Sequence, residues 1–155
     1  MQILGQIPTP QKYVKLMLDE VGYQKQLLGK TFIDNSCGDG NILAEAVKRY
    51  INASKNEGYT IETIKKNLEC DIFGYDIDKK AVITTIKRLN EIAGKEEIYD
   101  VSWNVRTADY LKTPANKFDY IVGNPPYITY HDLTITQRGY VKNNFTSCQE
   151  GRFDY

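Results

Sequence analysis

The sequence has few of the residues that hold disulfide-linked or metal-bound small proteins together. Its 155 residues include three cysteines and one histidine, His131. The cysteines lie far apart and form no Cys-x-x-Cys pair, which excludes a zinc-finger framework and a disulfide scaffold and favours a reducing cytoplasm. No apolar run reaches the roughly 18–20 residues that a membrane span needs, and the first residues lack a basic-then-apolar signal segment.

The chain also lacks an excess of charge of either sign. Its 20 lysines and arginines balance its 20 aspartates and glutamates, so the formal net charge is zero. This balance argues against strong non-specific nucleic-acid binding by this piece alone. With 41% hydrophobic and 26% charged residues, the composition is that of a globular protein, and the length predicts one domain.

Short apolar segments alternate with helical patterns along the chain. Strands are expected at residues 31–34, 71–75, 101–107 and 118–123, and helices at 8–28, 41–53, 60–69, 78–93 and from about 134 onward. This alternation predicts parallel βαβ units in an α/β, doubly wound sheet. We expect Thr9 to cap the first helix, Pro10 to occupy its first position, and Asp78 to cap the fourth.

In sheets of this kind, ligands bind beyond the carboxyl ends of the strands. The first expected strand ends in Asp34 and runs into Gly38-x-Gly40, where glycines let the backbone approach a ligand closely. The dinucleotide-binding fingerprint would require a third glycine where Leu43 stands. A carboxylate before the loop suits a cationic amino group better than a pyrophosphate, so nicotinamide or flavin binding is disfavoured.

Two further carboxylates follow expected strands. Asp76, in Asp76-Ile77-Asp78, stands where nucleotide-binding proteins place an acidic residue against ribose hydroxyls. Asp109 follows the third strand and could accept a hydrogen bond from an exocyclic amine such as that of adenine. The alternatives are that Asp76 shares helix capping with Asp78 and that Asp109 is an ordinary solvated loop residue.

Asn124-Pro125-Pro126-Tyr127 is the most specific pattern in the sequence. A planar amino group on a conjugated ring attacks poorly, because its lone pair is delocalised. The side-chain oxygen of Asn124 and the carbonyl of Pro125 would hold its two N–H bonds and stabilise the charge that develops on nitrogen. Pro126 offers no competing N–H, and Tyr127 offers a flat face for stacking. The alternative is a rigid turn alone.

These residues resemble a known family. Residues 32–43 resemble the first cofactor motif of amino-methylating DNA methyltransferases, and residues 124–127 resemble their catalytic motif. Thr9-Pro10 resembles the segment that closes over S-adenosylmethionine in the adenine-N6 branch, and Asp76 and Asp109-Tyr110 match the ribose-binding and adenine-binding motifs. As an ordered set, the motifs resemble the N6-adenine methylases of restriction-modification systems.

The resemblance implies a Rossmann-like, S-adenosylmethionine-dependent fold that methylates adenine N6 in double-stranded DNA, with the target base flipped out and without a metal. The catalytic residues that it implies are Asn124, Pro125, Pro126 and Tyr127. The cofactor-binding residues that it implies are Thr9, Asp34, Cys37, Gly38, Gly40, Asn41, Asp76, Ile77, Asp109 and Tyr110. We interpret Cys37 as a small loop residue, not a nucleophile.

The last residues, 151–155, resemble the opening of the next family motif. Residues 1–155 are therefore interpreted as the N-terminal part of a catalytic domain whose later strands and target-recognition domain are absent. We expect weak cofactor binding and no DNA turnover from this piece alone. Two alternatives stay open: a methyltransferase with the same motif acting on protein glutamine or RNA guanine, and a non-catalytic cofactor- or partner-binding module.

Overall fold

The structure, a computed structural model, describes residues 8–114, 116–126 and 131–150. The chain divides into two compact units, one made of Pro8–Asn124 and the other of Met1–Ile7 with Pro125–Tyr155. The larger unit contains the sheet and four of the α-helices. Tyr127 and the expected motif at 151–155 lie outside the described residues.

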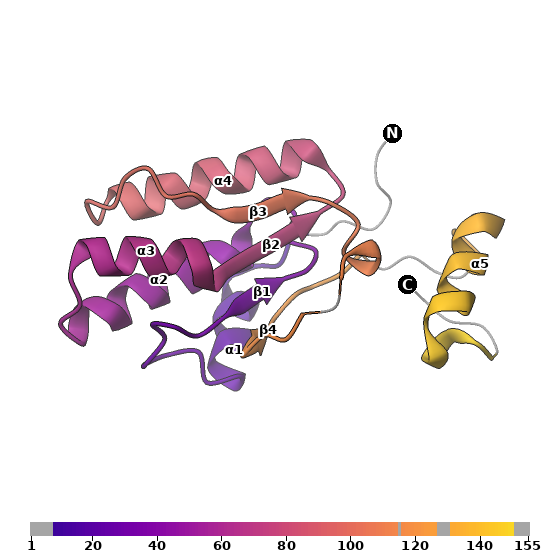
Figure 1. Ribbon diagram of the computed structural model, residues 1–155, viewed down its shortest axis with the longest axis horizontal. Coiled ribbons are helices and arrows are strands. Elements are labelled where there is room, and N and C mark those ends of the chain that lie inside the picture. Colours follow the sequence, from indigo (N-terminus) through magenta and orange to yellow (C-terminus); the bar gives the residue numbers. More distant parts are fainter. Residues whose placement is uncertain (1–7, 115, 127–130, 151–155) are drawn as a thin grey trace. The chain divides into compact units, whose positions relative to one another are not determined.

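The larger unit is built on a four-stranded parallel sheet with the order β3-β2-β1-β4. The strands are β1 (Phe32–Asp34), β2 (Ile72–Asp76), β3 (Asn104–Thr107) and β4 (Tyr120–Ile121). The arrowheads of β1, β2 and β3 point to the same side in Figure 1. The predicted parallel α/β sheet is therefore confirmed, and its strands present their carboxyl ends along one edge.

The last two strands are shorter than the sequence predicted. Ahead of β3, the backbone N–H of Ser102 donates to the Glu69 side chain at 3.0 Å and not to a neighbouring strand. Ahead of β4, the N–H of Asp119 donates to Thr31 Oγ1 at 3.0 Å, and its carboxylate accepts the N–H of Thr31 at 2.9 Å. Just before β3 and β4, hydrogen bonds to side chains thus take the place of the backbone hydrogen bonds that would extend each strand.

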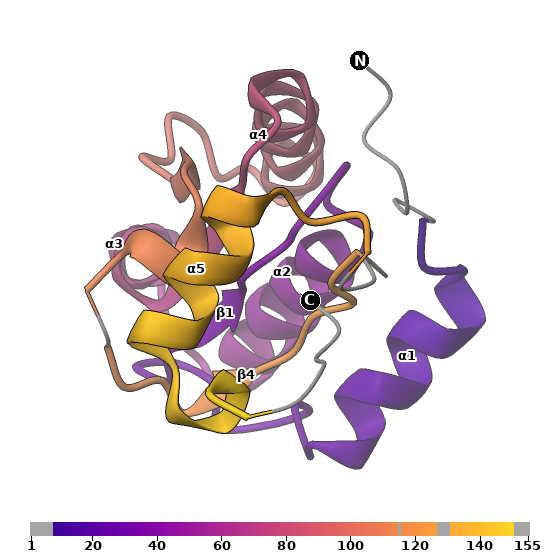
Figure 2. The same cartoon turned by 90° about the vertical axis from the view of Figure 1, so that its right-hand side faces the viewer.

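Three helices lie side by side: α2 (Asn41–Asn56) packs against both α1 (Gln11–Glu20) and α4 (Lys79–Gly94), and α2 and α4 contact the sheet. Figure 2 shows α2 between α4 and α1. The sequence placed these helices and also α3 (Ile61–Asp71), which leads directly into β2. The core between helices and sheet includes Phe32, Leu43 and Leu89, all fully buried.

The first helix differs from its prediction at both ends. It begins at Gln11, and Pro10 is its N-cap. Among the described residues no side chain makes a capping hydrogen bond to this helix, so Thr9 does not cap it. It ends at Glu20 and not near residue 28, because Gly22 adopts a left-handed φ of +72° and Tyr23 N–H returns to the carbonyl of Leu18 at 2.9 Å.

The predicted cap of the fourth helix is confirmed. The side chain of Asp78 accepts the N–H of Lys80 at 2.8 Å at the start of α4. Thr60 caps α3 in the same way, accepting the N–H of Thr63 at 3.3 Å.

The second unit contains α5 (Ile135–Asn144), the helix that the sequence predicted from about residue 134. Thr134 and Gln137 form a reciprocal capping box at its start. A short 3₁₀ helix, η2 (Thr146–Cys148), follows it.

Neither unit contains, in its described residues, a helix long and apolar enough to cross a membrane. The same residues hold no cluster of three or more potential metal ligands.

Candidate active site

The connection from β1 to α2 forms a tight loop at the carboxyl edge of the sheet, which we call the glycine loop (residues 34–40). Cys37 N–H donates to the carbonyl of Tyr75 at 2.8 Å, which ties the loop to β2. Gly38 and Gly40 take left-handed φ values of +52° and +83°, where other residues are strained. A methyl group on Gly40 would lie 2.7 Å from Thr85 Oγ1, so α4 packs directly on the loop.

Asp34 opens the glycine loop with a buried carboxylate. The residue is 1% exposed, and its Oδ1 accepts the N–H of Ser36 at 3.2 Å. Burial raises the pKa of Asp34 to about 7; the Ser36 bond acts in the opposite direction, and the charge of Asp76 raises it further. A carboxylate that is desolvated to this degree would be stabilised by a cationic ligand group, as the sequence suggested.

Asp76, at the end of β2, holds the glycine loop from the other side. Its Oδ2 accepts the N–H of Gly38 and its Oδ1 accepts the N–H of Asp78, each at 2.8 Å. Asp76 therefore joins two loops and does not share the capping bond of α4, which Asp78 makes. Each carboxylate oxygen can accept more than one hydrogen bond, so contact with ribose hydroxyls stays a prediction. The neighbouring Ile77 is 56% exposed at this edge.

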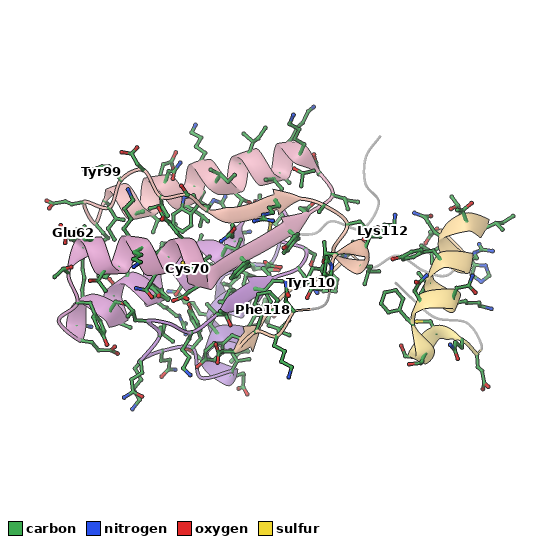
Figure 3. All side chains as sticks on the ribbon, in the orientation of Figure 1. Glu62, Cys70, Tyr99, Tyr110, Lys112 and Phe118 are labelled. Carbon is green, nitrogen blue, oxygen red and sulfur yellow. The ribbon has the colours of Figure 1, made fainter. Side chains whose placement is uncertain are left out.

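Asp109 and Tyr110 lie after β3, at the start of the short helix η1 (Tyr110–Lys112). Asp109 Oδ1 accepts the N–H of Leu111 at 3.2 Å, and Oδ2 pairs with Lys112 Nζ at 3.1 Å. The Tyr110 ring lies 5.4 Å from that of Tyr75 on β2. Figure 3 shows Tyr110 and Lys112 at the end of the sheet toward which the arrowheads of β2 and β3 point. Adenine binding by Asp109 and Tyr110 stays a prediction.

Asn124 is brought to the same edge by β4. The N–H of Val122 donates to the carbonyl of Ile33 at 3.0 Å, so the chain runs beside β1 almost to the motif. A methyl group on Gly123 would lie 2.9 Å from Asn35 Oδ1 and 3.1 Å from Asp34 Oδ1. Asn124 is thus one residue from direct contact with the glycine loop. Pro125 and Pro126 belong to the other unit, and Tyr127 is not among the described residues.

Thr9 and Asn41 contact each other at the start of their helices. Asn41 Nδ2 donates to the carbonyl of Thr9 at 3.4 Å, and its Oδ1 accepts from Arg88 Nη1 at 2.5 Å. The Thr9 hydroxyl accepts from Asn124 Nδ2 at 3.1 Å. The structure therefore links residues predicted for the cofactor, Thr9 and Asn41, to the predicted catalytic Asn124.

Sequence reasoning missed three residues that shape this edge: Thr85, Arg88 and Gly123. Thr85 Oγ1 donates to the carbonyl of Gly38 at 2.9 Å, and Arg88 lies 3.7 Å from the carboxylate of Asp39. Thr85 and Arg88 are three residues apart on α4, so helical periodicity predicts that they share one face of the helix. It does not predict that this face contacts the glycine loop.

The thiol of Cys37 is buried in the glycine loop. It is 5% exposed, and burial, together with the charges of Asp34 and Asp76, raises the pKa of its thiol strongly. Since the thiolate is the nucleophilic form, this environment supports the interpretation of Cys37 as a small loop residue.

Comparison with known proteins identifies the family. The family model described as "Eco57I restriction-modification methylase" matches residues 15–155, which cover most of the chain, the glycine loop and the Asn124 motif among them. The chain belongs to this family.

Relatives of this Eco57I-family chain are type II methyltransferases. M.VspI of Vibrio sp. (strain 343) is 35% identical over 100 residues, which cover 63% of this chain and 19% of that protein. M.BstVI of Geobacillus stearothermophilus is 32% identical over 137 residues, or 80% of this chain and 24% of that protein. The chain therefore spans about a fifth to a quarter of the length of these curated relatives.

The fold of this Eco57I-family chain recurs in solved structures. A modification subunit of a putative type I restriction enzyme from Vibrio vulnificus YJ016 matches with a TM-score of 0.57 and 21% identity, over 84% of this chain and 27% of that one. The predicted Rossmann-like α/β fold is confirmed by this likeness and by the parallel sheet.

Proposed function

We propose that the protein containing this chain methylates the N6 atom of adenine in double-stranded DNA with S-adenosylmethionine, as the modification activity of a restriction-modification system. The observation that carries the proposal is the position of Asn124 beside the glycine loop, one residue beyond the Gly123 contact with Asp34 and Asn35. Membership of the Eco57I restriction-modification methylase family supports it. The free thiols Cys37, Cys70 and Cys148 support a reducing cytoplasm as its compartment.

The residues at the strand ends fit S-adenosylmethionine, which supplies a methyl group on a positively charged sulfur when bound. The buried carboxylate of Asp34 has a pKa raised to about 7, so an ammonium group beside it would relieve the cost of its charge. At Gly38 an added methyl group would meet nothing within 4 Å, so the backbone of the glycine loop is open to close approach there. Asp76 would accept from ribose hydroxyls, Ile77 would cover one face of the adenine ring, and Asp109 would accept from its amine.

Asn124 would act on the amino group of the target base. Its side-chain oxygen accepts one N–H, and the Pro125 carbonyl is the second acceptor. During methyl transfer these two oxygens would stabilise the positive charge that develops on the attacking nitrogen, and the proton that this nitrogen releases would pass to water. The base must first leave the duplex, at a cost of a few kcal/mol.

The test uses the intact protein with isotopically labelled S-adenosylmethionine. We offer it double-stranded DNA, RNA and a protein release factor in parallel, and we expect label in DNA alone. Label in RNA or in the release factor would reassign the substrate class. Binding of S-adenosylmethionine without transfer to any substrate would favour a non-catalytic module.

A variant pair tests the role of Asn124. We expect Asn124→Ala to lower the methylation rate by about 100-fold or more, because an acceptor aligned with the developing charge is lost, while affinity for S-adenosylmethionine changes by less than about twofold. Asn67→Ala is the matched control, since the Asn67 amide donates to the carbonyl of Thr63 in its own helix. Retention of activity in Asn124→Ala would contradict the assignment.

A further inference from the structure

The Thr9 hydroxyl is not used by the helix that follows it. Pro10 is the N-cap of α1, and its carbonyl accepts the N–H groups of Tyr13 and Val14 at 2.9 and 3.1 Å. Thr9 Oγ1 instead accepts a hydrogen bond from Asn124 Nδ2 at 3.1 Å, from a residue 115 positions away in the chain. Both residues belong to the larger unit.

In this hydrogen bond the NH₂ end of the Asn124 amide faces Thr9. A carboxamide is planar, with a donor NH₂ at one end and an acceptor oxygen at the other. Anchoring Nδ2 on Thr9 directs Oδ1 away from Thr9. If the amide rotated by half a turn, its NH₂ would meet the N–H bonds of an amino substrate, and two donors repel.

Thr9 is itself held in place by the start of α2. Asn41 Nδ2 donates to the Thr9 carbonyl at 3.4 Å, and Asn41 Oδ1 accepts from Arg88 Nη1 at 2.5 Å. Two residues after Thr9, Gln11 Nε2 donates to Glu45 Oε2 on α2 at 2.8 Å. These bonds hold the backbone that carries the Thr9 hydroxyl against α2, the helix that begins at the end of the glycine loop.

We propose that Thr9 is a positioning residue for methyl transfer, which holds the Asn124 amide with its oxygen presented to the amino group of the substrate. The inference rests on the proposed function and changes the role expected for Thr9 from cofactor contact to alignment of Asn124. It predicts an effect on the chemical step and little effect on cofactor binding.

The test compares Thr9→Val, Thr9→Ser and Thr84→Val in the intact protein, with kcat and KM measured for S-adenosylmethionine and for DNA. Valine keeps the shape of threonine but cannot accept the bond, so kcat should fall about 10-fold, with each KM within about twofold of wild type. Serine keeps the hydroxyl and should restore kcat to within about twofold. Thr84→Val removes a hydroxyl that donates within its own helix, to the carbonyl of Lys80, and should behave as wild type.

Two results would overturn the inference while leaving the proposed function intact. One is a Thr9→Val enzyme with unchanged kcat and a raised KM for S-adenosylmethionine, which would make Thr9 a cofactor contact. The other is an equal fall of kcat in Thr9→Ser and Thr9→Val, which would show that the hydroxyl of Thr9 is not the group that matters for the rate. If Thr9→Val does not fold, Thr9→Ala replaces it under the same criteria. A wild-type protein that does not methylate DNA would instead refute the proposed function and the inference together.

Discussion

The free energy of unfolding of the wild-type chain should fall as pH rises because of Asp34, and replacing Asp34 by asparagine should abolish this part of the fall. The carboxylate is 1% exposed, and its pKa is raised from 3.8 to about 7, mainly by burial. The native state therefore binds the Asp34 proton more tightly than the unfolded state does. Wherever the native state holds more protons, the free energy of unfolding falls with increasing pH, here between about pH 4 and pH 7.

The size of the effect follows from the two pKa values. Their difference, 7 − 3.8 = 3.2, corresponds to about 4 kcal/mol over the whole titration at about 1.36 kcal/mol for each pH unit. Between pH 5 and pH 8, about 2–3 kcal/mol of this is expected. The cost of burying the asparagine amide does not depend on pH, so it cancels when each protein is compared with itself.

Urea denaturation at pH 5 and pH 8 measures this difference. The free energy of unfolding of the wild-type chain should fall more steeply between the two values than that of Asp34→Asn. Asp119→Asn is the control, because hydrogen bonds from Thr31 lower the pKa of Asp119. Asp119 thus contributes stability above its unfolded pKa that is lost only at lower pH, and its removal should leave the slope from pH 5 to pH 8 unchanged. Equal slopes for wild type and Asp34→Asn would refute the reasoning.

Two further predictions concern stability and are checked by urea denaturation at pH 7. A methyl group on Gly74 would lie 2.6 Å from Leu43 Cδ1, so Gly74→Ala should destabilise the chain by about 1–3 kcal/mol. Adding Leu43→Ala should cost less than the sum of the two single changes, whereas strict additivity would argue against this clash. Tyr50→Phe removes the hydroxyl that donates to the buried carboxylate of Asp71, which also accepts the N–H of Gly29 at 2.8 Å. It should cost about 1–3 kcal/mol, and a change below about 0.5 kcal/mol would count against a structural role for that bond.

Much of the sheet and its edge could be predicted because the signals are local. Asp34 closes an apolar segment and precedes two glycines, and Asp78 precedes a helical pattern, so each could be placed from its neighbours alone. Since parallel strands end at one edge, the order of the elements alone puts Asn124 and the glycine loop at the same edge of the sheet, and the close approach of Gly123 to Asp34 and Asn35 agrees with this.

The errors arise where a distant partner changes what a local pattern means. Threonine before proline is a reasonable helix cap, but the Thr9 hydroxyl is bonded to Asn124, and no local pattern reports a partner 115 residues away. The prediction for the first helix runs to residue 28 because Gly29 suits the end of a helix, whereas α1 ends before Gly22, and Tyr23 and Leu27 reach the core from the irregular segment that follows. The roles of Thr85 and Arg88 depend on how α4 packs on the glycine loop, which helical periodicity alone does not give.

The most direct test of the central claim identifies the atom that receives the methyl group. DNA treated with the intact protein and S-adenosylmethionine is digested to nucleosides and analysed by mass spectrometry against authentic standards. We expect N6-methyldeoxyadenosine as the methylated product, and we expect it to be absent when the Asn124→Ala variant is used. Methylated cytosine, or unmodified DNA from a protein that binds the cofactor, would contradict it.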